Sequence, residues 1–283
     1  TAEAGHFADL RAVGCNRLGL GVQSFREASL RRLGRAHTVA DAERAYTVAR
    51  GAGFASVSID LIFSIPGADP GDWSHSLRRA VDLAPDHLSA YALTVEPGTP
   101  FARRREEGDL PPVPEAEDEA AYLSTVECLR EAGYEHYEIS NFARPGYRCR
   151  HNWDTWTGGE YVGVGLSAHS CLDGRRFWNT ADFDDYLRRI DAEGAARDGE
   201  EPPDATRTAR ERIWLGLRTC EGVELRPDQV LRLADSALWQ QLERHGHATL
   251  EADRLRLTER GLAVADGLSE AVADEICGRA VAA

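Results

Sequence analysis

Gln23, Arg35 and Asp60 are polar residues whose side chains could together hold a small polar ligand. A guanidinium pairs with a carboxylate through two parallel hydrogen bonds, and an aspartate accepts hydrogen bonds from hydroxyl or amino groups. Ile62 and Ala92 lie near the ends of neighbouring predicted strands, where small apolar side chains would let a flat ring lie against a sheet. The alternative is that these residues form ordinary ion pairs, and their spacing alone favours that alternative.

Cys149, His151, His169 and Cys171 have the residue types of a metal site. Residues two apart on a strand share a face, so each close pair could offer two ligands to zinc. Structural zinc sites usually leave two to four residues between paired ligands, which makes this spacing unfavourable. The six cysteines show no C-x-x-C spacing, and this favours reduced thiols over a disulfide framework.

Gly163 and Gly165 resemble the start of a phosphate-binding loop. A dinucleotide-binding loop needs a third glycine and a helix directly after it, because the helix N-terminus holds the phosphate. Neither feature follows Gly165. The pair therefore indicates close packing of the backbone.

Strands that alternate with helices must position these residues. The hydrophobic pattern predicts strands at 17–24, 56–63 and 87–95, with helices ending near 33 and covering 39–50 and 72–83. Thr38 is the expected N-cap of the second helix. Strands separated by single helices imply a parallel sheet, and in a barrel of such units the loops after the strands form the active face.

The second half of the chain predicts a different organisation. A loop at 96–114 leads to a helix at 115–132, and two apolar segments follow near 134–139 and 161–169. Further elements are helices at 208–218, 228–244 and 259–268 and a hairpin at 248–258, an order typical of a winged helix. We therefore predict domains at 1–192 and 206–283, joined by a linker at 193–205.

Composition limits the partners of the protein. The formal net charge is −14, from 47 acidic residues and 33 basic ones that are all arginine. Such a chain is repelled by phosphate, and the hairpin of the tail carries Glu251 and Asp253, so we expect no nucleic-acid binding and at most peripheral membrane contact. No apolar run approaches the roughly 20 residues of a membrane span, and the residues that follow Thr1 do not have the pattern of a signal peptide. We expect a cytoplasmic protein.

Several segments carry a family resemblance. NRLGLGVQSF at 16–25, LGRAH at 33–37 and SIDLIFSIPG at 58–67 resemble strands of the radical S-adenosylmethionine (SAM) family that includes HemW-type heme chaperones and oxygen-independent coproporphyrinogen III oxidases. Matching segments follow in order at 86–93, 96–99, 137–146, 161–165, 168–170 and 215–218. The resemblance predicts an α/β fold, namely the second half of a radical SAM (β/α) barrel followed by a small winged-helix-like domain.

The resemblance also implies ligand-binding residues in the first part of the chain. In the family, the positions that match Gln23, Arg35, Asp60, Ile62 and Ala92 contact SAM. These positions are the expected cofactor-binding residues of this protein.

Two segments point to the heme-chaperone branch, and the first is YEISNF at 137–142. The segment HNWDTW at 151–156 resembles the signature H-N-x-x-Y-W of that branch, with Thr155 in place of the tyrosine. His151 is then the candidate heme-iron ligand, a role that imidazole fills as an axial donor. The alternative is a histidine held by backbone hydrogen bonds beside an aromatic cluster. The branch implies heme binding and delivery to heme-acceptor proteins, and the sequence leaves a dimer open.

One expected motif is absent from these 283 residues. The family binds a [4Fe–4S] cluster through C-x-x-x-C-x-x-C, which does not occur in this sequence. The chain begins at Thr1 in mid-pattern, with Glu3 at a further SAM-contacting position, so we expect a truncated, weakly stable chain that does not cleave SAM. Whether the chain is an enzyme is left open. The alternatives are the coproporphyrinogen oxidase, which decarboxylates a porphyrinogen, and a non-enzymatic interaction scaffold.

Overall fold

The computed structural model describes residues 4–278, so the predicted role of Glu3 lies outside the described residues. Tertiary contacts divide the chain into two compact units that meet in sequence after Arg148. No helix in the described part of the chain is long and apolar enough to cross a membrane.

The first unit is built on a five-stranded sheet with the order β1-β2-β3-β5-β4. Its strands are β1 (Arg17–Gln23), β2 (Ser56–Phe63), β3 (His87–Ala92), β4 (Glu135–Glu138) and β5 (Asn141–Ala143). The first three strands are parallel, as the sequence predicts. β5 runs antiparallel to β3, and β4 runs antiparallel to β5, so the sheet ends in a hairpin that the pattern of βα units did not predict.

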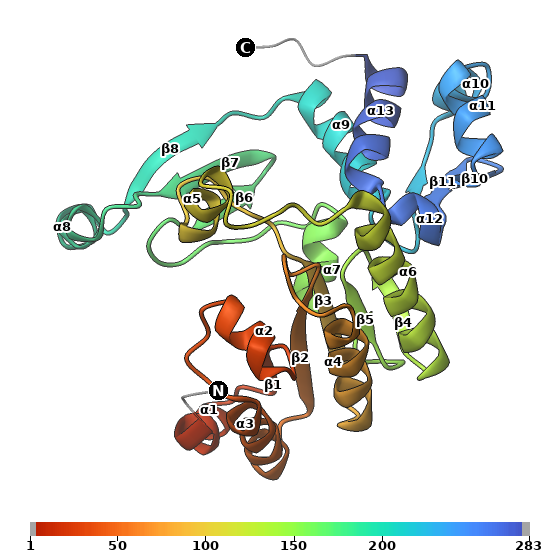
Figure 1. Ribbon diagram of the computed structural model, residues 1–283. Helices are drawn as coiled ribbons and strands as arrows, with labels where there is room; N and C mark the ends of the chain where they lie inside the picture. Colours follow the sequence, from red (N-terminus) through yellow and green to blue (C-terminus); the bar gives the residue numbers. More distant parts are fainter. Residues whose placement is uncertain (1–3, 279–283) are drawn as a thin grey trace. The chain divides into compact units, whose positions relative to one another are not determined.

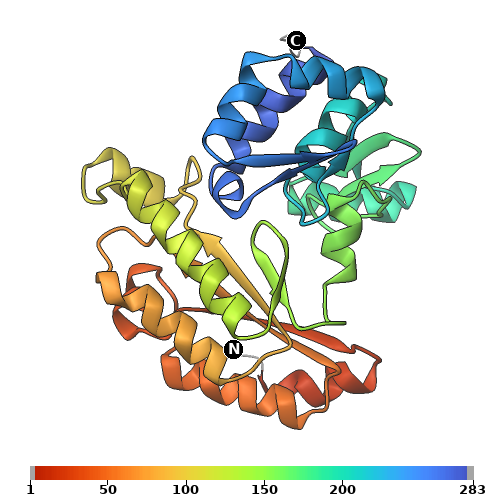
Figure 2. The ribbon, with the colours of Figure 1, turned by 90° about the vertical axis from the view of Figure 1, so that its right-hand side faces the viewer.

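Three helices of the first unit cover one face of this sheet (Figures 1 and 2). They are α3 (Val39–Gly51), α4 (Pro70–Asp82) and α6 (Glu115–Glu131); the smaller elements are η1 (Ala4–His6), α1 (Phe7–Ala12), α2 (Glu27–Arg32) and α5 (Pro100–Glu106). Alternate strand residues such as Leu20, Ile59 and Leu88 are buried and form the core under the helices. The other face of the sheet carries the intervening residues.

Helix caps explain which local predictions succeed. Thr38 caps α3 in a capping box with Asp41, which confirms the predicted N-cap. The predicted loop at 96–114 was wrong in part, because Thr99 caps α5 there and Pro100 occupies the first helical position. The Thr-Pro pair was the sequence signal for this helix.

The second unit begins with a small antiparallel sheet of order β6-β7-β8. It contains β6 (His169–Leu172), β7 (Arg175–Asn179) and β8 (Arg197–Glu201), with helices α7 (Arg150–Trp156) and α8 (Phe183–Glu193). The segment expected as a linker at 193–205 includes β8, which pairs with β7 along its length. In the apolar segment 161–169, only an isolated bridge from Tyr161 to Cys171 and the first residue of β6 belong to sheet structure.

The rest of the second unit has the winged-helix order that the sequence predicts. Its elements are α9 (Ala205–Gly216), β9 (Val223–Glu224), α10 (Pro227–Ala234), α11 (Ala237–Arg244), β10 (Ala248–Glu251), β11 (Arg254–Leu257), α12 (Glu259–Leu262) and α13 (Ala265–Cys277). The hairpin of β10 and β11 is confirmed. The single helix predicted at 228–244 is instead two helices, because Ser236 caps α11 by accepting the Trp239 amide at 3.0 Å.

Candidate functional site

A row of polar side chains crosses the face of the first sheet that lies opposite α3, α4 and α6. Gly21 is the register partner of Asp60, Asp60 of Ser89, Ser89 of Asn141, and Asn141 of Glu138. Residues directly opposite on neighbouring strands point to the same face, so four polar side chains stand side by side across β2, β3, β5 and β4. Polar groups on one face beside an apolar core mark this face as a candidate ligand site.

A β-bulge brings Glu138 into the row. One extra residue, Tyr137, is inserted in β4 between His136 and Glu138, so that Tyr137 and Glu138 both reach the same face. The two-residue turn that follows places Asn141 opposite Glu138, and the Asn141 Nδ2 donates to Glu138 Oε1. The Ser140 amide donates to Glu138 Oε2 at 3.2 Å.

The amide oxygen of Asn141 is a buried acceptor without a hydrogen bond. Asn141 is 4 % exposed and Glu138 is 1 % exposed. Both oxygens of Glu138 accept hydrogen bonds, but Asn141 Oδ1 has no partner among the described residues. Buried polar atoms are nearly always paired, so this exception needs an explanation.

A second row of polar groups lies beside the first. The Ser58 Oγ lies 2.8 Å from His87 Nδ1, and His87 Nε2 lies 2.9 Å from the Tyr137 hydroxyl. Burial, helped by the positive charge of Arg17, lowers the pKa of His87 to about 3. The imidazole is therefore neutral and bridges two hydroxyl groups.

Hydrogen bonds, and no ion pair with a described residue, hold the two carboxyl groups of the face. Burial raises the pKa of Glu138 to about 7, although hydrogen bonds from Asn141 and Ser140 oppose the rise. Burial also raises the pKa of Asp60, although hydrogen bonds from Ser89 and Ser58 and the positive charge of Arg17 oppose the rise. Neither carboxyl forms an ion pair with a described residue. The face thus offers acceptors to a ligand that carries hydrogen-bond donors.

Three of the five predicted SAM positions lie together on this face. Asp60 and Ile62 are two residues apart on β2, so their side chains point to the same face. Gln23 is the last residue of β1 and has a φ of 70°. Its side-chain amide lies over Gly21, because a Cβ atom on Gly21 would come within 2.8 Å of the Gln23 Nε2. Because Gly21 is the register partner of Asp60, the Gln23 amide stands next to the polar row.

The other two predicted positions lie elsewhere in the first unit. Ala92 is the register partner of Phe63, and by alternation it belongs to the opposite face from Ile62. It lines a cavity of about 190 Å³. Arg35 follows α2 in a loop, where its amide donates to Leu30 at 2.9 Å; its side chain is exposed and pairs with no described residue.

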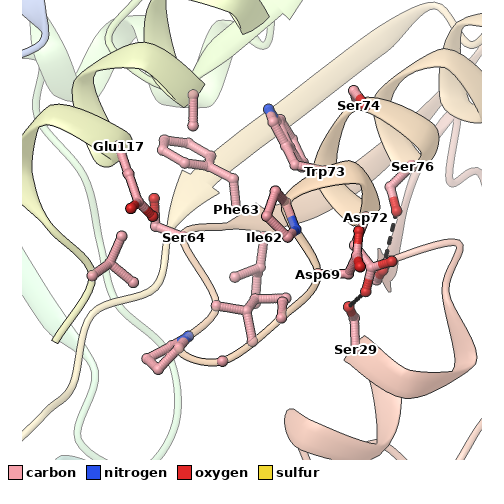
Figure 3. A pocket seen from close by; sticks show the side chains of 18 of the residues that line it. Ser29, Ile62, Phe63, Ser64, Asp69, Asp72, Trp73, Ser74, Ser76 and Glu117 are labelled. Carbon is pink, nitrogen blue, oxygen red and sulfur yellow. Dashed lines mark hydrogen bonds between the residues drawn. The ribbon is translucent and has the colours of Figure 1, made fainter. Parts of the chain in front are cut away.

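A cavity of about 750 Å³ opens at the C-terminal end of β2 (Figure 3). Ile62 lines it and so connects it to the polar face. The Ser29 hydroxyl donates to Asp72 Oδ2 at 2.7 Å on one side of the cavity, and the rings of Phe63 and Trp73 lie with centroids 5.3 Å apart on the other. The cavity combines apolar walls with hydroxyl and carboxyl groups, as ligand pockets do.

His151 lies on α7 in the second unit with its side chain exposed. The Thr155 hydroxyl donates to the backbone carbonyl of His151 at 2.9 Å, but the imidazole forms no hydrogen bond or ion pair with a described residue. The alternative of a histidine held by backbone hydrogen bonds is therefore not observed. Thr155 and Trp156 line a cavity of about 600 Å³, to which Cys171 and Arg176 also contribute.

The zinc hypothesis finds no support in the described residues. No group of three or more His, Cys, Asp or Glu that could hold a metal occurs among residues 4–278. Packing explains Gly163, as predicted, because a Cβ atom there would come within 2.2 Å of the His169 carbonyl oxygen. Gly165 has open space around it, and its φ of 108° is the reason for a glycine there.

Sequence reasoning missed the residues at the hairpin end of the row. A signal was available in the alternation of polar residues along two strands, Ser58 with Asp60 and His87 with Ser89, which marks a polar face. Glu138 and Asn141 flank a two-residue turn, but only the pairing of β5 with β3 places them beside Ser89.

Comparisons with known proteins give the relatives of this chain. It is 36% identical over 263 residues to the "Heme chaperone HemW" of Mycobacterium tuberculosis, covering 93% of this chain and 66% of that protein. It is 41% identical over 180 residues to the protein of that name in Escherichia coli, covering 62% of this chain and 46% of that protein. It is 32% identical over 286 residues to the bovine "Radical S-adenosyl methionine domain-containing protein 1, mitochondrial", covering 95% and 64%. No family model matches the sequence.

A solved structure confirms the fold class. Coproporphyrinogen III oxidase (HemN) from Escherichia coli, described as a radical SAM enzyme, matches with a TM-score of 0.78 over 95% of this chain and 66% of that chain, at 22% identity. The two units therefore have the α/β fold of a radical SAM protein. The chain belongs to the HemW-type family. It spans between about half and two thirds of the length of the curated relatives named above.

Proposed function

We propose that the protein is a heme chaperone, which binds heme through His151 and delivers it to acceptor proteins. Relatives that cover most of this chain are named heme chaperones, and this supports the proposal. The observation that carries it is the exposed imidazole of His151 on α7, because an axial heme ligand needs a ring nitrogen that no other group occupies.

Heme titration tests the role of His151. Heme added to the 283-residue chain should give a Soret shift that the His151→Ala variant loses. His245→Ala is a matched control, since His245 is also exposed and lies in the second unit at the end of α11, and this variant should keep the shift. Absence of heme binding by the wild-type chain would contradict the proposal and favour the interaction scaffold.

We further propose that the polar face of the first unit holds SAM. Asp60 would accept hydrogen bonds from the ribose hydroxyls, the Gln23 amide would contact the polar end of the ligand, and Ile62 would lie against the ring. The exposed guanidinium of Arg35 is available for the ligand carboxylate. SAM supplies a reactive sulfonium group when bound, and these residues would bind and orient it.

The cysteines of this chain do not fit the [4Fe–4S] cluster that the family implies. Such a cluster needs three thiolates from a short loop, and this sequence contains no C-x-x-x-C-x-x-C. We therefore infer that the 283 residues by themselves do not cleave SAM. Iron content and 5′-deoxyadenosine formation after anaerobic reconstitution check this inference, and a bound cluster with turnover would show it to be wrong.

The remaining expectations stay predictions. The coproporphyrinogen oxidase alternative has only the likeness of fold behind it, since the solved oxidase is 22% identical to this chain. A cytoplasmic location and the oligomeric state, with a dimer as one alternative, are open to size-exclusion and fractionation experiments.

A further inference from the structure

The hairpin tip at Glu138 and Asn141 has no role in the function proposed above. Its side chains hold each other in one orientation, because Glu138 Oε1 accepts from Asn141 Nδ2 while Glu138 Oε2 accepts from the Ser140 amide. A planar amide whose nitrogen is fixed also has a fixed oxygen. Asn141 Oδ1 is thus held in the buried row without a donor.

The neighbours of this oxygen on the sheet indicate what could reach it. Ser89 on β3 lies between Asn141 and Asp60 in the row, so the two acceptors are two strand intervals, or about 10 Å, apart. Tyr91 follows on the same side of β3 and is 41% exposed. Burial raises the pKa of the Tyr91 hydroxyl, and interactions with Ser89 and Asn141 oppose the rise.

The chemistry of the row selects for a ligand with donors at both ends. Asp60 and Glu138 are carboxyl groups that form no ion pair with a described residue, and Asn141 adds a carbonyl-type acceptor. A nucleoside has hydroxyl donors on its sugar and an amino donor on its base. Heme propionates carry only acceptors when ionised, and they would leave Asn141 Oδ1 without a donor.

We infer that Asn141 is a second anchoring residue for the nucleoside part of the ligand, with its Oδ1 accepting a hydrogen bond from an N–H or O–H group while Asp60 accepts from the other end. Glu138 is a positioning residue that keeps the Asn141 amide in this orientation. This inference rests on the proposed SAM site of the first unit. It explains the unpaired oxygen as an acceptor that the ligand satisfies.

Titration calorimetry with S-adenosyl-L-homocysteine tests the inference, because this compound carries the nucleoside and needs no cluster chemistry. Asn141→Leu keeps the approximate volume but has no acceptor, and it should weaken binding about tenfold, as expected for one lost buried hydrogen bond. Ser269→Ala is the matched control, since Ser269 Oγ is also buried and unpaired but lies on α13 in the second unit. This variant should bind like the wild type.

Two variants of Glu138 separate positioning from a merely structural role. Glu138→Gln still offers an oxygen to Asn141 Nδ2 and should bind within about twofold of wild type. Glu138→Leu frees the amide and should weaken binding as Asn141→Leu does. If Asn141→Leu fails to fold, the affinities of Glu138→Gln and Glu138→Leu for S-adenosyl-L-homocysteine test the inference instead. Equal affinities of these two variants would overturn it.

The outcomes also distinguish this inference from the function on which it rests. Binding that Asp60→Ala weakens but Asn141→Leu leaves unchanged would overturn the role of Asn141 and leave the SAM site standing. No binding of S-adenosyl-L-homocysteine by the wild-type chain would overturn both the SAM site and this inference. The heme titration at His151 is independent of either result.

Discussion

Glu138 and His87 lie on the same face of one sheet, and burial shifts their pKa values in opposite directions. The pKa of Glu138 rises from 4.5 to about 7, and that of His87 falls from 6.5 to about 3. Both groups are consequently neutral in the folded protein around pH 6. Their joint neutrality lets a carboxyl and an imidazole share a buried face without an ion pair.

The two groups should have opposite effects on the pH dependence of stability. Between pH 4.5 and 7 the folded protein keeps a proton on Glu138 that the unfolded chain releases, so stability falls as pH rises. Between pH 3 and 6.5 the unfolded chain binds a proton that buried His87 does not, so stability rises with pH. From pH 4.5 to 6.5 these slopes cancel.

Glu138→Gln should expose the slope that the wild type hides. The wild type loses stability relative to this variant as the pH rises, because only the wild type must keep a proton on Glu138. The unfolding free energy of the variant minus that of the wild type should grow by about 1.4 kcal/mol per pH unit between pH 4.5 and 7, a total of about 3 kcal/mol. Urea unfolding across that pH range measures it. A difference that does not change with pH would show that Glu138 is ionised in the folded protein.

Asp86 should be important for the stability of the first unit. Its Oδ2 accepts from Arg50 Nη1 at 2.6 Å and from the Val57 amide at 2.9 Å, which ties α3 to the starts of β2 and β3. Asp86→Ala should lower the unfolding free energy by about 3 kcal/mol, because it leaves a partly buried guanidinium and a buried amide unpaired.

Two comparisons check the prediction for Asp86. Asp86→Asn keeps the acceptor for the Val57 amide and should cost less than Asp86→Ala. Glu43 forms an ion pair with Arg79 at 2.7 Å, and both side chains are more exposed than those of the Arg50–Asp86 pair. Glu43→Ala should therefore lower the unfolding free energy by less than about 1 kcal/mol. Equal losses for Asp86→Ala and Glu43→Ala would contradict the assigned role.

Asp266 should matter more than its exposure suggests. It pairs with Arg218, which is 2% exposed and lies with its Cζ 3.3 Å from the centre of the Trp214 ring. Asp266→Ala leaves this buried charge without its counter-ion and should cost about 2 kcal/mol, whereas Arg218→Met removes the charge itself and should cost less. Chemical denaturation of both variants checks the order, and the reverse order would refute it.

Gly163 should not tolerate a side chain. A Cβ atom there would approach the His169 carbonyl oxygen to 2.2 Å, so Gly163→Ala should destabilise the second unit by about 2 kcal/mol. Gly267→Ala is the control: nothing lies within 4 Å of its added Cβ on α13, and the change should stabilise that helix by about 0.5–1 kcal/mol. Thermal unfolding should separate the two variants, and similar melting temperatures would count against the packing argument.

The sequence by itself determined the features that depend on short stretches of chain. The Thr38 cap, the parallel strands beginning at Arg17 and Ser56, and the hairpin at 248–257 follow from local hydrophobic periodicity and capping chemistry. The breaks within 228–244 and the helix α5 are also local, and the sequence carried their signals in Ser236 and Thr99.

Only the tertiary structure decided which polar residues share a site. Asp60 and Asn141 are far apart in the chain, and the register of β3 with both of its neighbours brings them into one row. A shift of one residue in that register, or loss of the bulge at Tyr137, would turn the same side chains to the other face. Pairing between distant strands depends on the packing of the whole sheet and not on the residues of one strand. For this reason the motif at Glu138 was visible in the sequence, while its place beside Asp60 was not.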